Sequence, residues 1–222
     1  VHTAVEIFVT QMAQAYQQGR YAQGEKWLRA ALREAEAFGS EDPRLGRTLN
    51  DLAVMSYTEG KYADAETLYK RLTGIQEKLL GPDHPDVALS TYNMAVLSEA
   101  QGRYREAEAL HKRALEIRTT AFGAGHADVA RSLHGLAVLY HAQGKYYKAA
   151  PLYEKSLALQ EKLLGPEHPD LALNLHGLAA LNDVHGRPAE AEHLYKRALR
   201  IREKALGSEH PDLARSLNAL AA

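Results

Sequence analysis

A helix-breaking segment recurs along this chain with a constant step. Its fullest copies are Gly81-Pro82-Asp83-His84-Pro85-Asp86 and Gly165-Pro166-Glu167-His168-Pro169-Asp170. The glycines that open the copies stand at positions 39, 81, 123, 165 and 207, so each step is 42 residues. A constant period in this range indicates a repeat array with one continuous core. The chain length of 222 residues therefore says little about the number of domains.

Each 42-residue unit is predicted to form two helices. In residues 128–143 apolar side chains occur at offsets 0, 4, 7, 8 and 11, the spacing of one face of an α-helix. A Gly-Lys-Tyr turn at 144–146 closes this run, and a second apolar-periodic run follows at 147–164. Each unit is thus predicted to be a helical hairpin, with a first helix (helix A) and a second helix (helix B).

The recurring segment has a physical role as a link between hairpins. Gly165 can adopt a positive φ and end helix B, and Pro169 suits the first position of a new helix. Asp170 then places a negative charge at the positive end of that helix. Glu167 and His168 are both candidates for the N-cap.

We therefore expect an all-α solenoid of stacked helical hairpins that forms a single array over residues 1–222. Its repeats are predicted at 1–38, 43–80, 85–122, 127–164 and 169–206, followed by a partial repeat or capping helix at 211–222. The first unit is atypical, since its register slips by one residue. In addition, Trp27 stands at a repeat position (a column of equivalent residues, one per unit) that tyrosine or histidine occupies in the other units. Because the chain starts at Val1 and ends inside a repeat, we also expect a fragment of a longer protein.

The residue columns distinguish between two families of two-helix repeats with this period, the HEAT-like repeats and extended tetratricopeptide repeats (TPRs). The third full unit has, in order, Leu133, Leu136, Ala137, Tyr140, Ala149, Tyr153 and Ser156. This series resembles the TPR pattern of large, Leu, small, Tyr, Ala, aromatic and small residues. Ala95, Ala137 and Ala179 are predicted to be small because helix B crosses helix A there.

The long helix B and its link resemble, more narrowly, the TPR of the kinesin-light-chain type. The resemblance rests on His-Pro-Asp-Val-Ala at 84–88, Leu-Asn-Asp-Leu-Ala-Val at 49–54, Gln-Gly-Arg-Tyr-Arg-Glu-Ala-Glu at 101–108 and Tyr-Lys-Arg-Ala-Leu-Arg-Ile-Arg-Glu-Lys at 195–204. It implies a right-handed superhelix and a protein–protein interaction scaffold. Such a scaffold binds an extended peptide segment of a partner in a concave groove lined by helix A. The heptad segment that joins kinesin light chain to its motor is not seen, so motor binding is not inferred.

The groove is predicted on the second face of helix A, with one column added from helix B. Its expected residues are Arg47, Asn50, Val54, Tyr57, Tyr92, Asn93, Val96, Arg118, Arg131, His134, Val138, His141, His176 and Arg202. The arginines could bind carboxylates, the asparagines and histidines could hydrogen-bond a peptide backbone, and the valines could contact apolar side chains. We therefore expect a protein or peptide ligand with acidic and apolar residues. A polar helix face can also be merely solvated, but apolar and aromatic residues in register favour a recognition surface.

Other classes of function find less support in the sequence. The net charge of −1 favours neither nucleic acid nor a membrane, and basic clusters on helix B alternate with glutamates. RNA binding is the weaker alternative, while an oligomerisation or spacer module of a larger signalling protein is the stronger one. Self-association through the open C-terminal edge belongs to that alternative.

No site for catalysis or metal binding stands out. The link histidines His84, His126, His168 and His210 are one repeat apart, about 10 Å, and cannot converge on one ion, so we expect helix caps. No phosphate-binding loop, catalytic triad or paired carboxylates appear. We expect no enzymatic activity, cofactor or metal. The absence of cysteine fits a reducing compartment, and we expect a cytoplasmic protein.

Overall fold

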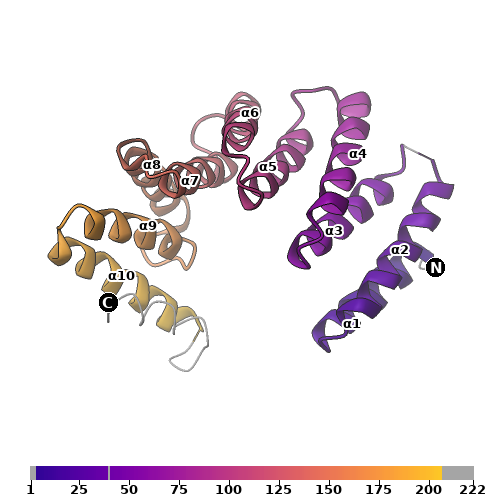
Figure 1. The fold of residues 1–222 in the computed structure, drawn as a ribbon, viewed down its shortest axis with the longest axis horizontal. Helices are drawn as coiled ribbons and strands as arrows, with labels where there is room; N and C mark the ends of the chain where they lie inside the picture. The colour runs from indigo at the N-terminus through magenta and orange to yellow at the C-terminus, as the bar shows by residue number, and fades with distance from the viewer. Residues whose placement is uncertain (1–3, 40, 207–222) are drawn as a thin grey trace. The chain divides into compact units, whose positions relative to one another are not determined.

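The computed structural model describes residues 4–39 and 41–206, and the predicted helix at 211–222 lies outside them. The described part contains ten α-helices and no strands. Their bounds are α1 Ala4–Gln17, α2 Tyr21–Ala37, α3 Pro43–Thr58, α4 Tyr62–Leu80, α5 Pro85–Ala100, α6 Tyr104–Phe122, α7 Ala127–Ala142, α8 Tyr146–Leu164, α9 Leu171–Val184 and α10 Pro188–Leu206. Consecutive helices pair as hairpins (Figure 1), which confirms the all-α fold with about five repeats.

By its internal contacts the chain divides into two compact units. Unit 1 is Val1–Ile117 and unit 2 is Arg118–Ala222, so that the division falls within α6. A single array over residues 1–222 stays a prediction.

Glycine ends the helix before the link as predicted, and proline starts the next helix in two of the links. Gly81 and Gly165 end α4 and α8 with φ values of 90° and 87°, a region of backbone conformation that favours glycine. Pro43 and Pro85 are the first residues of α3 and α5, where no intrahelical N–H bond is lost. The chain therefore stops one helix and starts the next within four residues.

Histidine is the N-cap of two helices that follow a link, α5 and α7, whereas Asp42 caps α3. The Nδ1 atom of His84 accepts a hydrogen bond from the backbone N–H of Asp86 at 3.2 Å. His126 and His168 each accept the same bond from the residue two positions later, at 3.1 Å and 3.3 Å. In the fourth link His168 rather than Glu167 is the acceptor, but neither predicted candidate is the N-cap of α9, which is Asp170 and forms no side-chain cap bond. His84 and His126 thus use a ring nitrogen to satisfy a backbone donor at a helix start, while His168 does so in the turn that precedes α9.

The start of α9 differs from the prediction. The helix begins at Leu171, so Pro169 precedes it instead of occupying its first position. The N–H of Leu171 bonds to the carbonyl of His168, and that of Ala172 bonds to the carbonyl of Pro169, both at 3.1 Å. These bonds span three residues rather than four, so a tighter turn comes before the α-helix.

Small buried alanines stand on both helices of a hairpin, and in the last hairpin Ala179 of α9 and Ala191 of α10 belong to one apolar cluster. Ala95, Ala137 and Ala179 on helix A are each 0% exposed, which is consistent with a place where helix B crosses helix A. Ala107 and Ala149 on helix B are also 0% exposed. Because alanine presents only a methyl group, the paired helices can approach closely, and larger apolar residues pack around the crossing.

Candidate functional site

The second face of helix A is formed in unit 1 by α3 and α5. The Nδ2 of Asn93 donates a hydrogen bond to the Oδ1 of Asn50 at 3.2 Å, so these two columns lie side by side. Val54 is 42% exposed and Arg47 is exposed, one turn to either side of Asn50. Val96 is half-buried on α5. The structure therefore brings together amide, apolar and cationic groups that the sequence placed in the groove.

Two hollows adjoin this face of unit 1. One has a volume of about 300 Å³ and is lined by Val5, Glu6, Val9, Thr10, Arg44, Arg47 and Thr48. The other has a volume of about 420 Å³ and is lined by Met12, Leu28, Asn50, Asp51, Val54 and Met55. Three of the predicted groove residues thus line concave surface, with Arg47 in one hollow and Asn50 and Val54 in the other.

The predicted tyrosines of unit 1 are less exposed than expected. Tyr57 is half-buried beside Tyr62, with ring centroids 5.8 Å apart, and burial raises the pKa of its hydroxyl. Tyr92 is half-buried with its ring edge-on to His111 at 5.2 Å. These rings help to pack the helices, so each has only part of its surface left for a ligand.

In unit 2 the second face of helix A is formed by α7 and α9. Val138 is 38% exposed on α7. Arg131 is exposed and forms an ion pair with Asp128 three residues earlier, at 3.1 Å. An exposed pair of this kind contributes little to stability, so the guanidinium can exchange it for a ligand carboxylate.

His134 belongs to a hydrogen-bond network that the sequence did not reveal. Asn174 is 0% exposed, and its Nδ2 donates to Ser156 Oγ at 2.9 Å and Gln160 Oε1 at 2.8 Å. The Oδ1 of Asn174 therefore faces Nδ1 of His134, 2.8 Å away, and that ring nitrogen must bear the hydrogen. Ser156 in turn donates to the carbonyl of Ala130. The network joins α7, α8 and α9, so His134 has a structural role as well as its place on the face.

A sequence signal for this network existed in the repeat. Position 174 belongs to a column that holds Thr48, Ser90, Ser132 and Asn174, which are all polar and 0–1% exposed. A polar column at a buried helix position indicates side chains that need partners inside the protein.

His141 and His176 pack against the tyrosines of unit 2. The His141 ring is edge-on to Tyr146 at 5.5 Å and to Tyr153 at 6.3 Å. His176 is edge-on to Tyr195 at 5.1 Å. Burial, followed by the charge of His176, lowers the pKa of His141. Both histidines are half-buried.

The position of Arg118 does not fit its predicted groove role. The side chain is 2% exposed, and its Nη1 donates to Ser132 Oγ at 2.8 Å and to the carbonyl of Asp128 at 3.3 Å. The guanidinium thus ties α6 to the start of α7 and has too little exposure to receive a ligand. Gln160, at the equivalent position of α8, likewise points inward and accepts a hydrogen bond from Asn174. Arg202, at the equivalent position of α10, is half-buried.

The basic clusters of helix B are engaged with acidic neighbours. Arg113 bonds Glu77 of the preceding repeat at 2.6 Å, and Lys112 bonds Glu108 within its own helix at 2.6 Å. Arg197 makes the equivalent bond to Glu161 in unit 2 at 2.6 Å. This pairing reduces the positive field that a nucleic acid would require.

Residues 4–39 and 41–206 were also compared with the requirements of a metal site and of a membrane-spanning helix. No group of three metal-ligating side chains comes together in this part of the chain. None of its helices combines the length and the apolar character needed to cross a bilayer.

Solved structures of the kinesin-light-chain type resemble this chain over most of its length. BtubC (BKLC) from P. vanneervenii is 27% identical with a TM-score of 0.78, over 93% of this chain and 82% of that one. A kinesin-light-chain structure with nearly identical TPR-like repeats from Podosopora anserina is 26% identical with a TM-score of 0.71, over 94% and 100%. A thermophilic TPR protein of Thermus thermophilus, at 22% identity and a TM-score of 0.63 over 98% and 100%, shares the fold.

No curated protein is similar enough to the chain to count as a match. The sequence pattern of the tetratricopeptide repeat, in contrast, matches in overlapping segments at residues 6–78, 55–120, 86–161, 128–204 and 184–222. These segments span nearly the whole chain, and the hairpins of the structure supply the helices that they require. The chain therefore belongs to the tetratricopeptide repeat family, with structural neighbours of the kinesin-light-chain type.

Proposed function

We propose that the chain is a scaffold that binds an extended peptide segment of a partner protein along the second face of helix A. Repeats of this family generally serve as protein–protein interaction modules and are typically non-catalytic. The observation that supports the proposal best is the hydrogen-bonded pair Asn50–Asn93, with Arg47 and Val54 exposed beside it. This combination offers partners for a peptide backbone, an acidic side chain and an apolar side chain.

Each kind of residue has a chemical role in this proposal. Asn93 gives one amide hydrogen to Asn50 and retains its carbonyl oxygen and second hydrogen for a peptide backbone. Exposed Arg47 and Arg131 can bind carboxylates with two parallel hydrogen bonds. Val54, which is exposed, can pack against an apolar side chain. The ligand class is therefore an extended segment with acidic and apolar residues.

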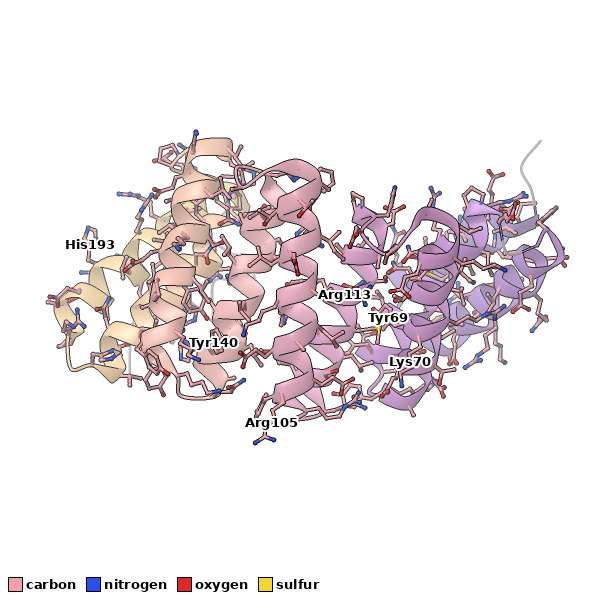
Figure 2. The ribbon with its side chains drawn as sticks, turned by 90° about the horizontal axis from the view of Figure 1, so that it is seen from above. Tyr69, Lys70, Arg105, Arg113, Tyr140 and His193 are labelled. Atoms are coloured by element: carbon pink, nitrogen blue, oxygen red, sulfur yellow. The ribbon has the colours of Figure 1, made fainter. Side chains whose placement is uncertain are left out.

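The test is a selection of displayed peptides on the whole chain, followed by fluorescence polarisation with the selected sequences. We expect Asn93→Ala and Arg131→Glu to weaken binding about tenfold or more, since each removes hydrogen bonds to the ligand. Arg105→Glu is the matched control, because Arg105 is exposed on α6 and its side chain projects outward in Figure 2. Unchanged binding in both groove variants would rule out this surface.

A further inference from the structure

The larger hollow of unit 1 is an apolar recess with a carboxylate in its wall. It has a volume of about 420 Å³ between α1, α2 and α3. Met12, Leu28 and Met55 belong to one apolar cluster of the core. Asp51 is the acidic residue of the lining, and Asn50 stands next to it. A ligand in the hollow would thus meet apolar walls and one carboxylate.

The apolar walls are held by close packing. Leu28 is 1% exposed and Met55 is 3% exposed, so both are anchored in the core. A Cβ atom at Gly24 of α2 would lie 3.4 Å from Cε of Met55 and 3.7 Å from Cγ of Met12, which shows how closely α2 approaches both methionines. The unbranched thioether side chains can adjust to the shape of a ligand without loss of this packing.

The carboxylate of Asp51 is poorly compensated within the protein. Burial raises its pKa, while the amide of Asn50 and the charge of Arg47 oppose the shift. The bond from Asn50 Nδ2 to Asp51 Oδ1 is long, at 3.4 Å. Among the described residues no cationic side chain forms an ion pair with Asp51. A half-buried carboxylate of this kind gains most from a cation that arrives with a ligand.

A short relay of amides links this carboxylate to the proposed peptide surface. Asn93 donates to Asn50, and Asn50 donates to Asp51, so the three side chains form one hydrogen-bonded chain that reaches the hollow at Asn50 and Asp51. The hollow and the pair Asn50–Asn93 therefore form one continuous polar path across α3 and α5. A peptide held by the asparagines would have a side chain within reach of Asp51.

We propose that this hollow binds a lysine or arginine side chain of the bound peptide, with the cationic group on Asp51 and the methylenes against Met12 and Met55. The proposal rests on the proposed function, which it extends from acidic and apolar ligand residues to a basic one. A purely apolar side chain fits the walls but covers Asp51 without compensating its charge. A basic side chain matches both, because its stem is apolar and its end is charged. With Arg47 one turn away on α3, the preferred ligand has residues of opposite charge close together.

The test uses a small cation, so it does not depend on finding the peptide. The chain has three methionines, of which Met12 and Met55 line the hollow and Met94 on α5 does not. Protein with ¹³C-labelled methionine methyl groups is titrated with n-butylguanidinium and, separately, with its neutral analogue n-butylurea. We expect saturable shifts of the Met12 and Met55 signals with the guanidinium compound, with Met94 as internal reference.

Substitution of the carboxylate supplies the decisive comparison. Asp51→Asn should weaken n-butylguanidinium binding about tenfold, since it removes a charge-assisted hydrogen bond. It should preserve the fold, because the neutral amide is nearly isosteric. Asp83→Asn, at an exposed position of the link, should leave the titration unchanged. Equal shifts with n-butylurea, no shift with either compound, or full binding by Asp51→Asn would each overturn the proposal.

The outcome also separates this proposal from the proposed function. If the groove variants leave peptide binding unchanged while n-butylguanidinium still depends on Asp51, only the peptide surface is refuted. Peptide selection is also carried out on the Asp51→Asn variant. If peptides bind through Asn93 and Arg131, but lysine and arginine are equally frequent in the peptides selected on wild type and on the variant, only the proposal of a basic ligand residue is refuted.

Discussion

Gly177 in α9 offers a sharp test of how closely the repeats of unit 2 pack. A Cβ atom at this position would lie 2.6 Å from Cζ and 2.7 Å from Cε1 of Tyr153 on α8. Because carbon atoms normally pack at about 3.5–4.0 Å, the ring would have to move by about 1 Å. Tyr153 is only 3% exposed, and its ring is edge-on to His134 at 5.6 Å and to His141. The ring therefore has little room to yield.

Two opposing effects set the magnitude for Gly177→Ala. Alanine inside a helix is favoured over glycine by about 1 kcal/mol. Overpacking of a filled core costs about 1–3 kcal/mol, and the buried ring places this site toward the upper end. We expect a net loss of about 1–2 kcal/mol in the free energy of unfolding. Gly74→Ala in α4 is the matched control, since no heavy atom lies within 4 Å of its Cβ position, and it should gain about 0.5–1 kcal/mol.

The assay is urea denaturation of both variants followed by far-ultraviolet circular dichroism. The midpoint should fall for Gly177→Ala and rise for Gly74→Ala. In a Tyr153→Leu background, which removes the obstructing ring, Gly177→Ala should become neutral or stabilising. A rise in the midpoint of the single variant Gly177→Ala would refute the reasoning, because it would mean that the ring moves without cost.

Three further predictions concern the histidines and the buried arginine. His84→Ala should lower the free energy of unfolding by about 1 kcal/mol through loss of the N-cap, whereas His84→Asn should restore most of it, and equal stability of the two variants would contradict the cap. The lowered pKa of His141 means that its neutral form is favoured in the folded state, so stability should be full above the unfolded pKa of 6.5 and decline as the pH falls toward the folded value. The profile of melting temperature between pH 8 and 5 should be flatter for His141→Gln, and identical profiles would argue against burial as the cause. Arg118→Met should lower the free energy of unfolding by about 2 kcal/mol, since it leaves Ser132 without a charged donor. If this variant instead weakens peptide binding and leaves the urea midpoint unchanged, Arg118 contacts the ligand and its structural role is refuted.

Several features of the fold followed directly from the repeat. The 42-residue step, the glycine of each link and the helical spacing of apolar residues are local properties of the chain, and the helices predicted at 128–143 and 147–164 agree with α7 and α8 to within one residue. The alanines of the helix crossings were also recognisable, because only a small side chain fits where two helices touch. The start of α9 was missed, since the choice between a tight turn and a first helical turn depends on small differences in backbone hydrogen bonding.

The candidate site was harder to predict from residue columns. Arg47 and Arg118 have the same chemistry and each recurs two repeats later, as Arg131 and Arg202, yet Arg47 is exposed and Arg118 is buried against Ser132. Asp51 was not among the predicted groove residues, and only the arrangement of α1, α2 and α3 shows that it lines an apolar hollow. The chain by itself thus determined which helices form and where they end, because these depend on neighbours along the sequence. Tertiary structure decided which side chains are exposed, because exposure depends on how each helix is rotated and packed against residues of the next repeat.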